Sequence, residues 1–199
     1  MALSYEDTGY IHVITQRATK IVNGLGLMDA AAALQVRDIV ARQYFDLNAI
    51  YTERDARIKA VKDKPGADKA AVDSVRKSAQ EDADRKIAVL HGQYLARLAK
   101  ELNPEQVDGV KDGMTYNVLH VTYRGYQEML PDLTQEQRAR ILSDLTEARE
   151  HAMDAESSEK KHAWFGKYKG RINNYLSAAG IDMKKASQDW AKRRNDGKQ

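Results

Sequence analysis

The chain has 199 residues, a formal net charge of +3 and no cysteine. Without cysteine it can form no disulfide, thiol nucleophile or cysteine-ligated metal site. The positive charge is concentrated at one end, because residues 184–199 carry six Lys or Arg against two Asp, a net of +4, which leaves −1 for the remainder. A tail of this size supports weak attraction to polyanions and does not indicate a nucleic-acid-binding domain.

No apolar run approaches the roughly 20 residues of a membrane-spanning helix. The first ten residues, MALSYEDTGY, lack the charged and apolar regions of a signal peptide. The sequence therefore predicts a cytoplasmic protein, unless a leader has been removed. With 42% apolar residues, 31% charged residues and three prolines, we expect one helical domain over residues 1–199, in which residues 184–199 form a basic, partly frayed tail.

The first half of the chain predicts one shorter helix, ending at Asn23-Gly24, and then two long ones. Asp29 is a suitable N-cap for a helix over about 29–62, and Asp68 begins another over about 68–102. Apolar residues recur every three or four positions along both, and Lys64-Pro65-Gly66 is a turn between them. This pattern predicts an antiparallel helical hairpin. The stretch 67–86 is nearly all alanine and charge, so we expect a thinly packed end that projects from the body.

Arg54 lies on the apolar stripe of the second helix, within YTERDARIK. Two interpretations are open. Its aliphatic stem can lie along the core while its guanidinium reaches solvent. Alternatively, its guanidinium is the floor of a polar pocket, because a buried arginine needs paired or hydrogen-bonded partners.

The second half contains two capping-box phrases, at 103–106 and 134–137, each of which predicts a helix start. Between them, YNVLHVTYRGYQEM (116–129) is rich in Val, Thr and Tyr and is interrupted by Gly125. Its alternation is imperfect, so strand and helix are both open.

The segment SSEKKHAWFGKYKGRINNYL (157–176) mixes aromatic side chains with cations and amides. Phe165, Tyr168 and Ile172 belong to an apolar helical face, and Gly180 is placed for a left-handed C-terminal cap. Trp164 falls largely off that face. Either it widens the buried face, or it forms part of a surface for a polar ligand or a protein.

Taken together, these elements predict an all-α helical bundle. Five histidines lie far apart and no HExxH occurs, so we predict no metal site; Glu147 and His151, four residues apart, indicate an exposed helix face with charge pairs. No phosphate-binding, dinucleotide-binding or GxSxG motif is present, which predicts no cofactor. A carboxylate pair of the glycosidase type is possible, but no pattern singles one out, so we name no catalytic residue and leave enzymatic activity undecided.

Three phrases carry a family resemblance: VRDIVARQYFDLNAIYTERDARIK, VTYRGYQEMLPDLTQEQ and EAREHAMDAESSEKKHAWFGKYKGRINNYL. They resemble a secreted bacterial family of unknown function that occurs in polysaccharide-degrading bacteria and is described as sugar-binding. The resemblance spans about Tyr10 to Asp182 and implies a periplasmic or secreted protein, although the signal peptide typical of the family is absent here. The LTQEQ phrase is also similar to the LTxxQ motif of small helical periplasmic chaperones.

We therefore predict a non-catalytic, carbohydrate-binding protein linked to the use of pectin-like plant polysaccharides, with an oligosaccharide as its partner. Segments 116–129 and 157–176 are expected to converge on one hollow, since sugars need flat aromatic rings beside fixed donors and acceptors. The predicted binding residues are His120, Tyr123, Arg124, Tyr126, Trp164, Tyr168, Lys169, Arg171 and Asn174. The alternatives are a helical chaperone or scaffold with an exposed apolar groove on the hairpin, or an enzyme acting on pectic sugars. The oligomeric state is left open.

Overall fold

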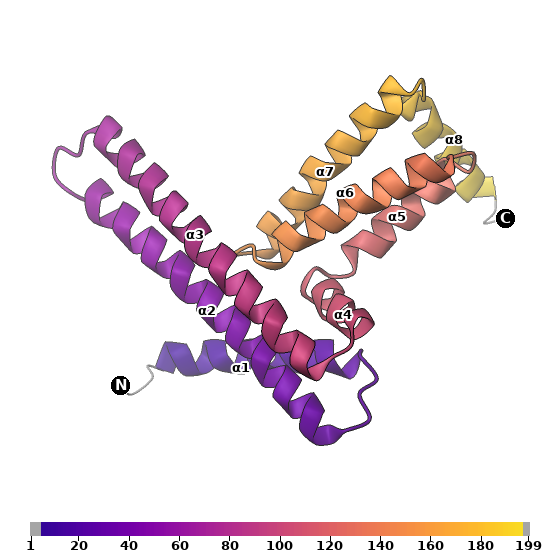
Figure 1. The fold of residues 1–199 in the computed structure, drawn as a ribbon. Helices are drawn as coiled ribbons and strands as arrows, with labels where there is room; N and C mark the ends of the chain where they lie inside the picture. The colour runs from indigo at the N-terminus through magenta and orange to yellow at the C-terminus, as the bar shows by residue number, and fades with distance from the viewer. Residues whose placement is uncertain (1–4, 197–199) are drawn as a thin grey trace. The chain divides into compact units, whose positions relative to one another are not determined.

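A computed structural model describes the backbone of residues 5–196 and the side chains of residues 9–196. Within this range the chain forms eight helices and no strand, which confirms the all-α prediction (Figure 1). The helices are α1 (Tyr5–Asn23), α2 (Ala30–Lys62), α3 (Lys69–Glu101), α4 (Pro104–Met114), α5 (Val118–Met129), α6 (Gln135–Met153), α7 (Ser158–Ala178) and α8 (Met183–Asp196).

These helices form two compact units, one up to Val110 and one from Lys111 onward, and the boundary falls within α4. Each unit has its own buried apolar side chains, so each is described separately. The expectation of one domain over residues 1–199 stays a prediction.

In the first unit, α2 and α3 form a long antiparallel hairpin, and α1 packs on α2 (Figure 1). The predicted N-caps are present: the Asp29 carboxylate accepts from the backbone N–H groups of Ala31 and Ala32, and Asp68 accepts from Ala70. The Tyr10 hydroxyl donates to the backbone oxygen of Tyr44 at 3.1 Å, which links α1 to α2. The caps thus fix where both helices begin, and burial of an apolar face stabilises residues 36–47 of α2 and 79–98 of α3.

The two halves of the hairpin are packed differently. On α2 the buried residues end at Leu47, and on α3 they begin at Ala79. Residues 51–78 therefore contain no buried side chain, and within the stretch 67–86, expected to be thinly packed, only Ala79 and Ala83 are buried. This end lies away from the part of α2 that α1 covers (Figure 1).

In the second unit, α6 packs along α7, α5 packs against α6 and α8, and α8 also contacts α7. The segment left open between strand and helix is helical, because α5 covers Val118–Met129 and buries Leu119 and Tyr126. Two residues before it, Tyr116 and Asn117, have φ values of 57° and 58°, in the left-handed region. The unit's core comprises Leu119, Tyr126, Leu133, Ile141, Leu145, Ala148, Ala152, Phe165, Tyr168, Ile172 and Leu176.

Local sequence also sets the helix ends of this unit. Both capping boxes are formed: Asn103 and Gln106 exchange two hydrogen bonds at the start of α4, and Thr134 and Gln137 do the same at α6. After α7, Gly180 has φ 87° and the N–H of Ile181 donates to the oxygen of Leu176, the Schellman arrangement expected at this glycine.

The basic C-terminal segment is helical as far as it is described. Helix α8 runs to Asp196, and Arg193 donates to the backbone oxygens of Glu128 and Met129, which ties α8 to the end of α5. Residues 197–199 of the expected tail lie outside the described residues. Fraying of residues 184–199 stays a prediction.

Candidate functional site

The outer edge of the α6–α7 pair carries a ladder of matched side chains. Along α6, these side chains are spaced four, three and four residues apart. Their partners on α7 have the same spacing in the opposite chain direction, because the two helices are antiparallel. The four pairs are His151 with Trp164, Glu147 with Tyr168, Asp144 with Arg171, and Arg140 with Tyr175. We call these eight residues, together with Lys167, the α6–α7 strip.

Trp164 is held at one end of the strip by stacking. The rings of His151 and Trp164 are nearly parallel, with centroids 4.4 Å apart and an interplanar angle of 15°. The Lys167 ammonium lies over the Trp164 ring, 4.8 Å from its centroid. His151 is exposed, and Trp164 is partly buried against the core, so it extends the buried face and also meets solvent. Its role in binding a ligand or a protein stays a prediction.

Asp144 organises the centre of the strip. Its carboxylate is 2% exposed and pairs with Arg140 Nε at 3.0 Å and with Arg171 Nε at 3.3 Å. Each guanidinium also lies over an aromatic ring: that of Arg171 is 5.6 Å from the Tyr168 centroid, and that of Arg140 is 5.4 Å from the Tyr175 centroid. A buried carboxylate with two charged partners fixes both arginines in the plane of the surface.

Glu147 and Tyr168 form a second fixed polar group. The Tyr168 hydroxyl donates to the Glu147 carboxylate, and this bond, with the neighbouring Arg171, holds the pKa of Glu147 below its usual value. Burial, together with the same hydrogen bond, raises the pKa of Tyr168 to about 12. Near neutral pH the strip therefore presents a neutral phenol and an ionised carboxylate that accepts hydrogen bonds.

The structure does not bring segment 116–129 onto this strip. Tyr126 is buried, and its hydroxyl donates to Asn173 Oδ1 at 2.7 Å and to the backbone oxygen of Lys169 at 3.4 Å. From the 3.6-residue period, Lys169 and Asn173 lie about 140° and 180° around α7 from Trp164. The α7 residues that Tyr126 contacts therefore lie on the side of α7 opposite Trp164. Convergence of the two segments on one hollow stays a prediction.

The other predicted binding residues are distributed over the same unit. Trp164, Tyr168 and Arg171 belong to the strip. Tyr123 is partly buried against the core, whereas the side chains of Arg124, Lys169 and Asn174 are exposed. A ligand-binding role for these seven stays a prediction.

His120 belongs to a separate charged network near the start of α5. Its Nε2 lies 2.8 Å from Asp112 Oδ2, and the other oxygen of Asp112 accepts from Arg149 Nη1, also at 2.8 Å. Lys111 pairs with both oxygens of Glu150 at 3.0 Å. This network joins the end of α4 to α5 and α6, and it holds the turn that contains Tyr116 and Asn117.

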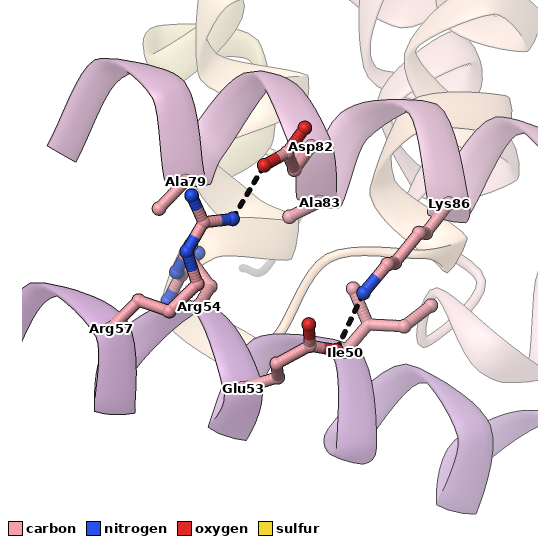
Figure 2. A pocket seen from close by; sticks show the side chains of 8 residues that line it. All are labelled: Ile50, Glu53, Arg54, Arg57, Ala79, Asp82, Ala83 and Lys86. Carbon is pink, nitrogen blue, oxygen red and sulfur yellow. Dashed lines mark hydrogen bonds and ion pairs between the residues drawn. The ribbon is translucent and has the colours of Figure 1, made fainter. Parts of the chain in front are cut away.

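The first unit has a polar notch of its own, between α2 and α3 (Figure 2). Arg54 lines it with its guanidinium mostly buried, paired with Asp55 at 2.7 Å and bonded to Gln80 at 3.3 Å. Two further ion pairs cross the notch, Arg57 with Asp82 and Lys86 with Glu53. The geometry matches the interpretation of Arg54 as the floor of a polar pocket, but the notch is narrow and its charges are paired.

No three His, Asp or Glu side chains among the described residues are placed to share a metal ion. None of the described helices combines the length and apolar character needed to cross a bilayer.

Residues 11–195 match the model of a family described as "protein of unknown function (DUF3826)". The chain belongs to this family. A search of curated proteins gave no match. The matched region includes both units of the chain, and with them the whole strip and the hairpin notch. The description of the family assigns it no activity.

The sequence analysis did not predict most of the residues of the strip. The residues absent from the predicted set are Arg140, Asp144, Glu147, His151, Lys167 and Tyr175. The i,i+4 spacing of Glu147 and His151 predicts an exposed charged face of α6, and both side chains are exposed, but α6 alone does not reveal their partners on α7. The signal that could have found the strip is the equal four-three-four spacing on two helices joined by a short connection.

Proposed function

We propose that this chain binds carbohydrate along the α6–α7 strip and performs no catalysis itself. The observation that carries the proposal is the position of Trp164, which lies at the solvent edge of a fixed ladder of rings and charges and is stacked on an exposed histidine. A sugar presents an apolar C–H face and a ring of hydroxyls, so its site needs a flat aromatic surface beside oriented polar groups. The strip supplies both on one face.

Each polar group on the strip is held in place before a ligand arrives. Glu147 is an acceptor fixed by Tyr168 and Arg171, and Arg171 is itself fixed by buried Asp144. Fixed groups lose little conformational entropy on binding, which favours affinity. Lys167 lies over Trp164 in the free protein, and we expect an arriving sugar ring to displace this exposed, flexible side chain.

The setting we propose is the use of plant polysaccharides, with pectin-like chains as the first ligands to test, in the periplasm or outside the cell. This part of the proposal depends on the family resemblance of the sequence. Fractionation of the native host with an antibody to the protein would contradict the location if the chain were found only in the cytoplasm.

The chaperone alternative requires an exposed apolar groove on the hairpin. The notch between α2 and α3 is lined instead by five charged side chains, with Ile50, Ala79 and Ala83 between them (Figure 2). This lining gives the alternative no support, so carbohydrate binding is the function we carry forward.

The test uses the two tryptophans, Trp164 and Trp190, both of which lie in the second unit. In a Trp190→Phe background, Trp164 is the single tryptophan and its fluorescence reports directly on the strip. We expect oligosaccharides from pectin or hemicellulose to change this fluorescence saturably, and calorimetry of the unaltered chain to give the same dissociation constant.

The matched variants are Trp164→Ala, on the strip, and Tyr116→Ala, which removes an exposed ring on another surface of the same unit. The first should abolish binding and the second should leave it unchanged, with circular dichroism confirming that both remain helical. Absence of binding across the panel would contradict the proposed function, and equal binding by both variants would remove the strip as the site.

A further inference from the structure

The strip places a cation over each of its three larger rings. Lys167 lies over Trp164, Arg171 over Tyr168 and Arg140 over Tyr175. Aromatic faces attract cations, so each contact holds a positive group against the surface on which a sugar would lie. The charges are thus arranged along the same line as the rings.

The three cations differ in how far they are already neutralised. Arg171 is engaged on two sides, by Asp144 at 3.3 Å and by Glu147 at 3.1 Å. Arg140 pairs with Asp144 through its Nε, and its side chain is 43% exposed, so its two terminal nitrogens are available to a ligand. Lys167 contacts the Trp164 ring, and its ammonium forms no ion pair among the described residues.

The two carboxylates of the strip do not cancel these end charges. Asp144 is buried beneath the arginines, and Glu147 is occupied by Tyr168 and Arg171 at the middle. Three cations and two carboxylates leave a net of +1 for the strip, and the excess lies at its two ends. The terminal N–H groups of an arginine match a carboxylate in two-point geometry, and an ammonium binds one as a point charge.

The distance between the ends sets the kind of ligand. Trp164 and Tyr175 are eleven residues apart on α7, which at 1.5 Å per residue is roughly 16 Å. A single sugar ring cannot reach both, whereas a short linear oligosaccharide can.

We propose that the strip is selective for linear acidic oligosaccharides, with Arg140 and Lys167 as the specificity-determining residues that bind the ligand's carboxylates at its two ends. This inference rests on the proposed function and deepens it by naming the charge of the ligand and the residues that select it. Asp144 is a positioning residue, because it orients the Arg140 guanidinium without facing the ligand.

The experiment compares tetragalacturonic acid with its fully methyl-esterified form, which lacks the negative charges and carries methyl groups in their place. Calorimetry on the full chain at low salt should give at least about tenfold tighter binding of the acid, since the ester cannot form the charge-assisted hydrogen bonds to Arg140 and Lys167. The preference should shrink as salt is raised, because both end cations are exposed. The double variant Arg140→Gln/Lys167→Gln should bind acid and ester equally, with ester affinity within about twofold of the unaltered chain.

A matched control, Lys184→Gln/Lys192→Gln, removes the same number of exposed cations from α8 and should keep the preference. Equal binding of acid and ester by the unaltered chain would overturn the inference while leaving carbohydrate binding intact. A preference that survives in the strip variant, or is lost in the control, would overturn the assignment to Arg140 and Lys167. Binding of neither ligand, nor of any neutral oligosaccharide, would overturn the proposed function as well.

Discussion

Asp144 and Arg171 meet across the α6–α7 pair, with Asp144 Oδ1 3.3 Å from Arg171 Nε, and one partner is buried while the other is half exposed. Because Asp144 is buried and Arg171 is half exposed, the two partners have different roles. The carboxylate cannot regain water without opening the helix pair, so it acts as a fixed point to which the mobile arginines are attached. The surface geometry of the strip therefore depends on a residue that a ligand would not touch.

Replacing Asp144 with Asn should test this dependence. Loss of the charge leaves Arg140 and Arg171 without their common acceptor, but both are half exposed and can return to water. We therefore expect the free energy of unfolding to fall by about 1–3 kcal/mol, less than for a pair buried on both sides. Urea denaturation followed by tryptophan fluorescence measures this directly, since both tryptophans report on the second unit.

The control for this variant is Ser143→Ala, one position away on the exposed face of α6. It should leave the free energy of unfolding within experimental error. A stability of the Asp144→Asn protein equal to that of the Ser143→Ala protein would show that Asp144 is not the anchor of the strip.

The parts of the fold that depend on local sequence could be predicted. The N-cap at Asp29, the two capping boxes and the left-handed Gly180 all follow from residues within a few positions of one another. Helix α5 could not be decided, because Val, Thr and Tyr favour strands and its apolar residues fit neither a helical stripe nor a strict alternation alone. Packing against α6 and α8 resolves what local preference leaves open.

The candidate site was predicted less completely, for a geometric reason. Grouping by composition placed Trp164 and Tyr126 together, whereas the α7 residues that Tyr126 contacts lie nearly half a turn around the helix from Trp164. The partners that do meet Trp164 and Tyr168 are His151 and Glu147, on a helix whose sequence alone indicates an ordinary charged face. A surface formed by two helices is visible only when their periodicities are compared in antiparallel register.

Lys161 should be a structural lysine whose removal destabilises the second unit. It is 5% exposed, and its ammonium donates to the backbone oxygens of Met114 at 2.9 Å and Met153 at 3.2 Å. These carbonyls belong to the last residues of α4 and α6, where no backbone N–H of the same helix is available to donate to them. Lys161→Met keeps the length of the side chain but leaves both carbonyls without this donor, so we expect a loss of about 2–4 kcal/mol in urea denaturation.

Lys160→Met is the matched change at the next position, where the side chain is exposed. It should alter stability little, because no buried acceptor depends on it. Equal losses for the two variants would mean that the cost comes from methionine in α7 and not from the two carbonyls.

The left-handed backbone conformation of Tyr116 should lower the free energy of unfolding, and glycine at this position should remove that cost. Its φ of 57° lies in the left-handed region, which costs a residue with a Cβ roughly 1–2 kcal/mol, and its ring is 52% exposed and stacked on His162. Tyr116→Gly and Tyr116→Ala both remove the ring, so their difference isolates the backbone. We expect the glycine variant to be more stable than the alanine variant by about 1 kcal/mol. An alanine variant as stable as the glycine variant would contradict the left-handed conformation at this position.

High pH should weaken the second unit through its buried tyrosines. Burial raises the pKa of Tyr126 to about 12 from an ordinary value of 10, and the pKa of Tyr168 is raised to about 12 as well. Between pH 10 and 12 the unfolded chain releases phenolic protons that the folded chain retains, so the free energy of unfolding falls as pH rises through this window and is unaffected by these groups below pH 10. For Tyr126 the loss should approach roughly 2 kcal/mol. Urea denaturation at pH 9, 10 and 11 measures the slope.

The variant that isolates this effect is Tyr126→Phe. It loses the hydrogen bond to Asn173 and should be less stable than the unaltered chain by about 1 kcal/mol at pH 8. The gap should close, and then reverse, as pH rises above 10, because phenylalanine has no proton to lose while the buried phenol of the unaltered chain increasingly favours the unfolded state. Parallel stability curves for the two proteins up to pH 11 would show that Tyr126 ionises as readily in the folded chain as in the unfolded one, which its buried position between α5 and α7 should prevent.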